Sequence, residues 1–185
     1  MPRAEYLTWC YNALMAQTVP GPDPFILPKK AIRMVEATGE EFEDVDIDHW
    51  ALPVIASLKE ARFFGEKAPK KFRPDAPLRR EEWSVMAVNF AATREQLLNM
   101  SKEVPATKLA VAMRLLNYTD TAAIKPAYQP YVWFIISDDK RRPWLDGTFE
   151  PPVNPGPWRP SKPVTRGEAA VFIGGFYEEI GKAFL

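Results

Sequence analysis

The sequence predicts an all-α protein with long, proline-rich loops, and three observations support this prediction. Apolar residues recur at helical spacing in several segments, whereas the alternation typical of strands is weak. The 185 residues include 19 prolines, which favour short elements joined by fixed turns. A chain of this length forms one ordinary domain, or two or three small repeats around a shared core.

Helical periodicity and stop signals place the elements. A first helix is expected over 3–17, with Cys10 buried and inert on its apolar face and a Pro-Gly-Pro stop at 20–22. A second is expected over 28–38, before Gly39. A third starts at its N-cap, Asp48. This helix and the remaining predicted helices cover residues 48–61, 79–99, 105–116, 123–137 and 165–181.

Composition excludes several functional classes. The 24 basic and 24 acidic residues cancel, which argues against a nucleic-acid partner. A single cysteine and a single histidine, His49, exclude a disulfide framework and a metal site rich in these ligands. No phosphate loop or nucleophile motif is present, so we expect no enzyme, no cofactor and no metal, with His49 structural. No leader or spanning segment is visible, which predicts an intracellular protein or a mature, trimmed chain.

The chain contains an internal repeat. Residues 72–83 and 158–169 both read aromatic-Arg-Pro-x-x-Pro-aliphatic-x-Arg-x-Glu, and residues 2–6 match the last part of this pattern. Upstream, 42–51 and 118–127 share an aromatic-x-Asp motif with an alanine seven residues after the aspartate. The three Arg-x-Glu units begin at Arg3, Arg80 and Arg166.

These three arginines lie in the first turn of their predicted helices, where a cation opposes the helix dipole. Their position suggests either a buried carboxylate partner or an anionic ligand. The glutamates two residues later are expected to start the helices, and residues 165–168 form a capping box. These glutamates are Glu5, Glu82 and Glu168.

The combined pattern over 42–83 resembles the S-layer homology module, and 118–169 resembles it more loosely. The resemblance implies a pseudo-threefold helical bundle packed as one domain. Its three parts would be the C-terminal half of a first repeat, a second repeat and a third repeat, over 1–20, 28–100 and 105–185.

The resemblance also implies non-enzymatic attachment to anionic, pyruvylated cell-wall polysaccharide, at the cell surface if the protein is exported. The repeat arginines Arg3, Arg80 and Arg166 would bind the carboxylate, because a guanidinium suits bidentate recognition. Trp50 is expected to pack in the core or, alternatively, to line a groove. The family's inter-helix loop corresponds to Asp146 and Gly147.

A second function of a different class stays open. The chain would then be a structural subunit of an intracellular or organellar assembly, presenting the loop over 143–160 to protein partners. Exposed Trp144 and Trp158 would anchor such an interface.

Overall fold

The computed structural model describes residues 1–16, 35–39, 41–60, 63–64, 70–92, 96–97, 99–100, 104–137 and 155–183. Within these ranges the regular elements are helices, and the extended pairings are isolated bridges, so the all-α prediction is confirmed. The α-helices are α1 (Arg3–Ala16), α2 (Leu52–Glu60), α3 (Arg80–Ala91), α5 (Ala106–Leu115), α6 (Gln129–Ile136) and α8 (Arg166–Ala183). Two short 3-10 helices, η2 (Thr121–Ala123) and η3 (Pro126–Tyr128), precede α6.

Several predicted boundaries need correction. Helix α2 begins at Leu52 and not near Asp48, because the preceding residues form a turn in which the His49 amide donates to the Asp46 carbonyl. Prolines at 126 and 130 split the helix expected over 123–137 into η3 and α6. Helix α3 ends at Ala91, where the next residue is extended. In the helix expected over 28–38, residues 35–38 are not helical, and 28–34 lie outside the described residues.

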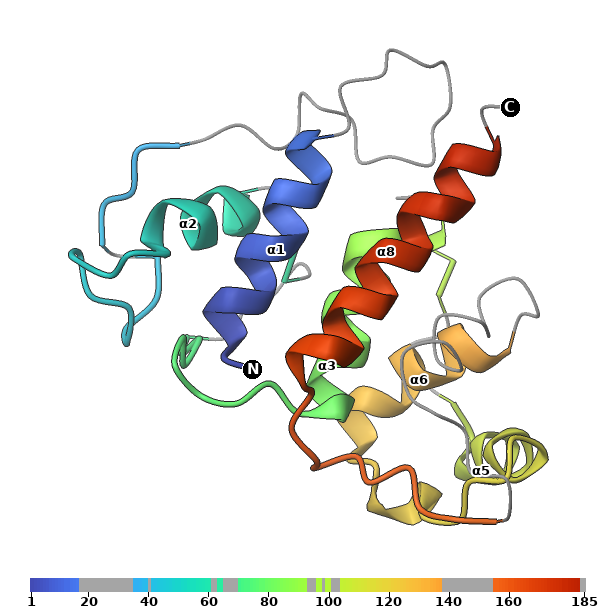
Figure 1. Ribbon diagram of the computed structural model, residues 1–185. Coiled ribbons are helices and arrows are strands. Elements are labelled where there is room, and N and C mark those ends of the chain that lie inside the picture. The colour runs from blue at the N-terminus through green and yellow to red at the C-terminus, as the bar shows by residue number, and fades with distance from the viewer. Residues whose placement is uncertain are drawn as a thin grey trace.

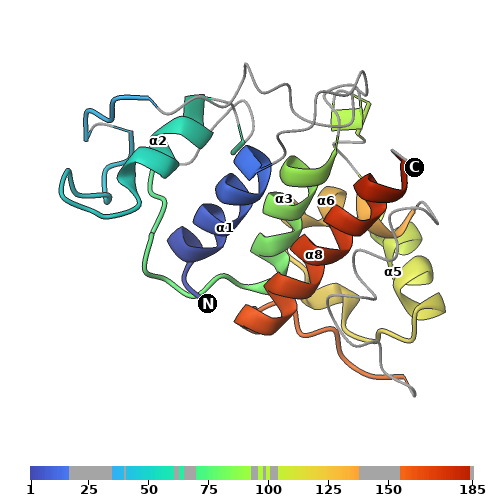
Figure 2. The ribbon, with the colours of Figure 1, turned by 45° about the horizontal axis from the view of Figure 1, so that its top comes forward.

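The three helices that begin with an Arg-x-Glu unit form the centre of the molecule. Figures 1 and 2 show α1, α3 and α8 next to one another, with α2 beside α1 and α6 beside α3. The contacts α1 with α2, α3 with α6 and α1 with α8 follow the same arrangement. Within the described part of the chain, no helix combines the length and the apolar character needed to cross a bilayer.

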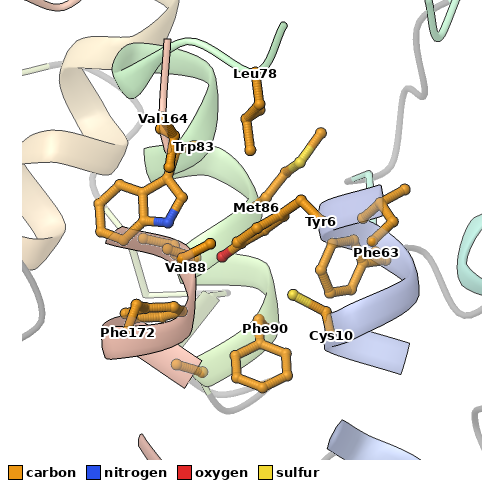
Figure 3. Close-up of a cluster of buried hydrophobic side chains, with 14 of the residues drawn as sticks. Tyr6, Cys10, Phe63, Leu78, Trp83, Met86, Val88, Phe90, Val164 and Phe172 are labelled. Atoms are coloured by element: carbon orange, nitrogen blue, oxygen red, sulfur yellow. The ribbon is translucent and has the colours of Figure 1, made fainter. Parts of the chain in front are cut away.

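The hydrophobic core lies between these central helices. Figure 3 shows Tyr6 and Cys10 from α1 facing Trp83 of α3 and Phe172 of α8. The Trp83 and Phe172 rings meet edge to face, with centroids 5.1 Å apart. Burial raises the pKa of the Cys10 thiol, which is buried as predicted and forms no disulfide. The core therefore fixes the starts of α1, α3 and α8 relative to one another.

Candidate functional site

The three Arg-x-Glu units join into a closed ring of ion pairs. Each arginine reaches the glutamate of the next unit along the chain, and the last arginine reaches back to the first glutamate. The pairs are Arg3 with Glu82, Arg80 with Glu168 at 2.8 Å, and Arg166 with both carboxylate oxygens of Glu5 at 2.6 and 2.9 Å. The expectation that the glutamates start their helices is therefore incomplete, because each of them also pairs with an arginine of another unit.

The arginines differ in exposure. The side chains of Arg3 and Arg80 are 11% and 10% exposed, whereas that of Arg166 is 69% exposed. Nη1 of the two buried arginines also donates to a backbone carbonyl, Phe72 for the first at 3.1 Å and Trp158 for the second at 2.5 Å. For Arg3 and Arg80 the structure thus supplies the buried carboxylate partner, the first of the two alternatives that the sequence left open.

Glu82 and Glu168 also cap their own helices. The Thr165 amide donates to Oε2 of Glu168 at 2.7 Å, and the Glu168 amide donates to the Thr165 hydroxyl at 3.1 Å, which confirms the predicted capping box. Burial raises the pKa of Glu168, but the hydrogen bonds from Thr165 and the pairing with Arg80 outweigh it and lower the pKa overall. One carboxylate therefore both starts a helix and holds its neighbour.

Two aspartates hold the aromatic-Arg-Pro loops in place. Asp44 accepts from two successive backbone amides at 2.8 and 3.0 Å, and Asp120 does the same at 2.7 and 2.8 Å. The sequence analysis aligned the two aspartates but did not predict that they hold these loops. Their equivalent positions in the two copies are the signal that could have indicated this role. The donors are Phe72 and Arg73 for Asp44, and Trp158 and Arg159 for Asp120.

The predicted partner anchor Trp158 is not on the surface. Its side chain is 0% exposed, so the expectation that it anchors an interface is wrong. Trp158 is the aromatic residue of the aromatic-Arg-Pro motif, as is Phe72, and both are buried under their loops. The predicted site residues Trp144, Asp146 and Gly147 lie outside the described residues.

Trp50, in contrast, is 62% exposed, which overturns the expectation of a core position and leaves the surface role. Its ring stacks on His49, with centroids 5.7 Å apart and an interplanar angle of 28°. Exposed Ile47 belongs to the same short segment and forms one end of a shallow, open hollow lined by residues between Thr38 and Ile47. Trp50 and Ile47 thus expose two large apolar side chains within four residues of the chain.

A buried acid was also missed. Glu81 is 1% exposed, and its carboxylate accepts from Nζ of Lys125 at 2.6 Å, which joins α3 to the start of η3. The hydrogen bond to Glu81 raises the pKa of Lys125. Lys125 lies five residues after Asp120, as His49 does after Asp44, but the residue equivalent to Glu81 in the first unit is Ala4, so the repeat does not predict this pair.

Comparison with known families gives one match. Residues 41–82 match the S-layer homology domain, a stretch that includes Asp44, Trp50, helix α2 and the start of α3 with Arg80 and Glu82. A search of curated proteins and a search of solved structures find no match.

Proposed function

Because residues 41–82 belong to the S-layer homology family, whose domains attach proteins to cell walls and surfaces, we propose that the chain binds cell-wall polysaccharide without catalysing a reaction. The observation that carries this proposal is the exposure of Trp50 within the matched segment. The C–H faces of a sugar ring pack well on a flat aromatic side chain, and its hydroxyls bind carboxylates at the edge.

The surroundings of Trp50 favour a neutral sugar at this position. The exposed acidic residues near it in sequence, Asp46 and Asp48, can accept hydrogen bonds from hydroxyls. Asp75, with Oδ1 3.7 Å from Nε2 of His49, adds a third exposed carboxylate. Together these negative charges repel a pyruvyl carboxylate, so an anionic group of the polysaccharide would have to bind elsewhere.

Pyruvylated sugar has less support as a ligand of the repeat arginines. Arg3 and Arg80 direct their guanidinium groups to carboxylates and carbonyls of the chain itself. We therefore assign these two arginines to the scaffold. A pyruvylated ligand rests on Arg166 alone, whose side chain is exposed.

The proposed scaffold is a pseudo-threefold bundle of a half repeat over 1–20 and two further repeats over 28–100 and 105–185. It is supported by the ring of Arg–Glu pairs and by a second ring of backbone bonds at equivalent positions. The bonds of this second ring run from Leu78 N to Met1 O at 3.0 Å, from Val164 N to Leu78 O at 2.7 Å, and from the Met1 amine to Val164 O at 2.8 Å.

Co-sedimentation with isolated peptidoglycan–polysaccharide tests the function. The full chain and the control Leu115→Ala, which removes a large exposed side chain on α5, should pellet with the wall material. Trp50→Ala should stay in solution while its circular dichroism remains unchanged, since an exposed side chain contributes little to folding. Failure of the wild-type chain to pellet would refute wall binding.

A parallel arm uses wall material treated with mild acid, which removes ketal-linked pyruvate. Equal binding before and after treatment is expected if Trp50 packs on a neutral sugar. Binding that is lost on treatment, yet retained by Trp50→Ala, would assign the ligand to Arg166.

A second candidate function, that of an interaction subunit in a larger assembly, is favoured by one observation. The surface of α8 that carries Arg166 is exposed, whereas the equivalent surfaces of α1 and α3 are buried.

A further inference from the structure

The central helices carry one equivalent stripe each, formed by the repeat arginine and the residues four and eight positions later. These positions lie on one face of a helix. In α1 and α3 all members of the stripe are buried, and in α8 all are exposed. The stripes are Arg3, Leu7 and Tyr11 on α1, Arg80, Ser84 and Val88 on α3, and Arg166, Ala170 and Gly174 on α8.

Each of these two helices has a covering segment, which consists of a helix and the loop that follows it. Helix α2 packs on α1, and α6 packs on α3 (Figures 1 and 2). The loop after each covering helix then presents three carbonyls, spaced two residues apart, to the start of the covered helix. The carbonyls are those of Phe72, Pro74 and Ala76 for α1, and those of Trp158, Pro160 and Lys162 for α3.

The three donors are the same in both cases. They are Nη1 of the arginine, the amide of the residue after it and the amide of the arginine itself. In α1 their bonds are 3.1, 3.0 and 3.1 Å long, and in α3 they are 2.5, 3.0 and 3.0 Å long. Because the six bonds agree, a covering loop is defined by three carbonyl acceptors at alternate residues.

In α8 the equivalent donors lack these acceptors within the described part of the chain. Among the described residues, no carbonyl accepts from Nη1 of Arg166 or from the amides of Arg166 and Gly167. The rest of the stripe is small, and a Cβ added to Gly174 would meet nothing within 4 Å. The surface is thus open both for a loop at its start and for a helix along its length.

We propose that the stripe of Arg166, Ala170 and Gly174 is a docking surface for a covering segment supplied by a different polypeptide. The loop of that segment would present carbonyls at alternate residues to Arg166 and Gly167, as the loops over 72–76 and 158–162 do within this chain. Its helix would lie on Ala170 and Gly174, in the place that α2 has on α1. This inference rests on the interaction function and is independent of sugar binding at Trp50.

A second copy of the chain is the less suitable occupant. Each copy holds two described covering segments and three stripes, so exchange of these segments between copies leaves one stripe uncovered per copy. A partner that carries an unused helix and loop completes the third stripe without uncovering another. The aromatic-Arg-Pro-x-x-Pro pattern describes the loop that fits.

A peptide copying residues 41–79, labelled with a fluorophore, is the probe, because it contains α2 and the loop that covers α1. Its fluorescence anisotropy is titrated with the full chain, with Ala170→Glu and with the matched control Ala106→Glu, at the first residue of α5. Both alanines are exposed and helical, so neither change should unfold the chain. Glu at 170 places a charge in the stripe and offers Arg166 a second partner within the chain.

The expected result is saturable binding by the wild-type chain and by Ala106→Glu, and binding weaker by about tenfold or more for Ala170→Glu. Absence of binding would overturn the proposal. Equal binding by Ala170→Glu would also overturn it, because the peptide would then have replaced a segment at another helix.

Sedimentation velocity of the full chain without peptide completes the test, and a monomer is expected. A dimer that Ala170→Glu dissociates would show that a second copy covers the stripe, and would overturn the choice of partner. Neither outcome depends on wall material, so failure here is distinguishable from failure of the sugar-binding proposal.

Discussion

Replacing the buried repeat arginine should harm the fold far more than replacing the exposed one. Arg80→Ala leaves the Glu168 carboxylate, which is 16% exposed, without its guanidinium partner. It also removes the donor to the Trp158 carbonyl. Breaking one side of a buried ion pair costs about 3–5 kcal/mol. Because both side chains keep some contact with water, we expect a loss near the lower end, about 3 kcal/mol.

Arg166→Ala is the matched control. It removes the same kind of side chain from an equivalent position, but its pair with Glu5 is exposed, so the free energy of unfolding should hardly change. Arg80→Lys keeps the charge without the two-pronged geometry and should fall between wild type and Arg80→Ala.

Urea unfolding followed by far-ultraviolet circular dichroism measures these differences as shifts in midpoint. Similar losses for Arg80→Ala and Arg166→Ala would refute the assignment of Arg80 to the scaffold. A small loss for Arg80→Ala alone would refute the argument that the pair is effectively buried.

Three further predictions follow. The folded pKa of Glu168 lies below its ordinary value of 4.5, because the hydrogen bonds from Thr165 and the pairing with Arg80 outweigh the effect of burial. The stability that this carboxylate contributes is therefore present above about pH 4.5, and it is lost as the pH falls through the lower, folded pKa. Glu168→Gln should flatten this dependence in urea titrations across that range. Asp120→Asn should lower the free energy of unfolding by about 1–3 kcal/mol, because the backbone amides of Trp158 and Arg159 lose a charged acceptor. Thermal unfolding measures this loss, and an unchanged midpoint would contradict the role of Asp120 in holding the loop. The buried Cys10 thiol should react with a thiol reagent only in denaturant, and rapid labelling of the native chain would contradict its burial.

The sequence predicts the parts of this fold that local chemistry determines. The capping box at 165–168 and the start of α1 follow from short-range patterns, and the repeat placed Arg80 at the first turn of α3. The apolar periodicity of residues 123–137 predicts one continuous helix. The prolines at 126 and 130 indicate a break, and the structure follows the prolines, with η3 and α6 as separate elements.

The remainder depends on contacts between distant segments. The partners of Arg3 and Arg80 are 79 and 88 residues away in the sequence. The local sequence around each arginine therefore could not show whether it binds a carboxylate of the chain itself or an external ligand. Exposure was misjudged for Trp50 and Trp158 in opposite directions, because a tryptophan suits both a core and an interface. Phe72, which holds the position equivalent to Trp158 in the other copy of the motif, is buried as Trp158 is.

The closed order of the Arg–Glu pairs has a consequence for how the molecule comes apart. In an open tandem array, each end unit has one neighbour, so unfolding can begin by fraying from an end. In a ring of three, every member has two neighbours, and opening any one helix breaks two links at once. The weakest link, Arg166 with Glu5, joins the segments furthest apart in sequence. Loss of that ion pair would leave the first and third units joined by the bond from the Met1 amine to the Val164 carbonyl and by the packing of α1 on α8.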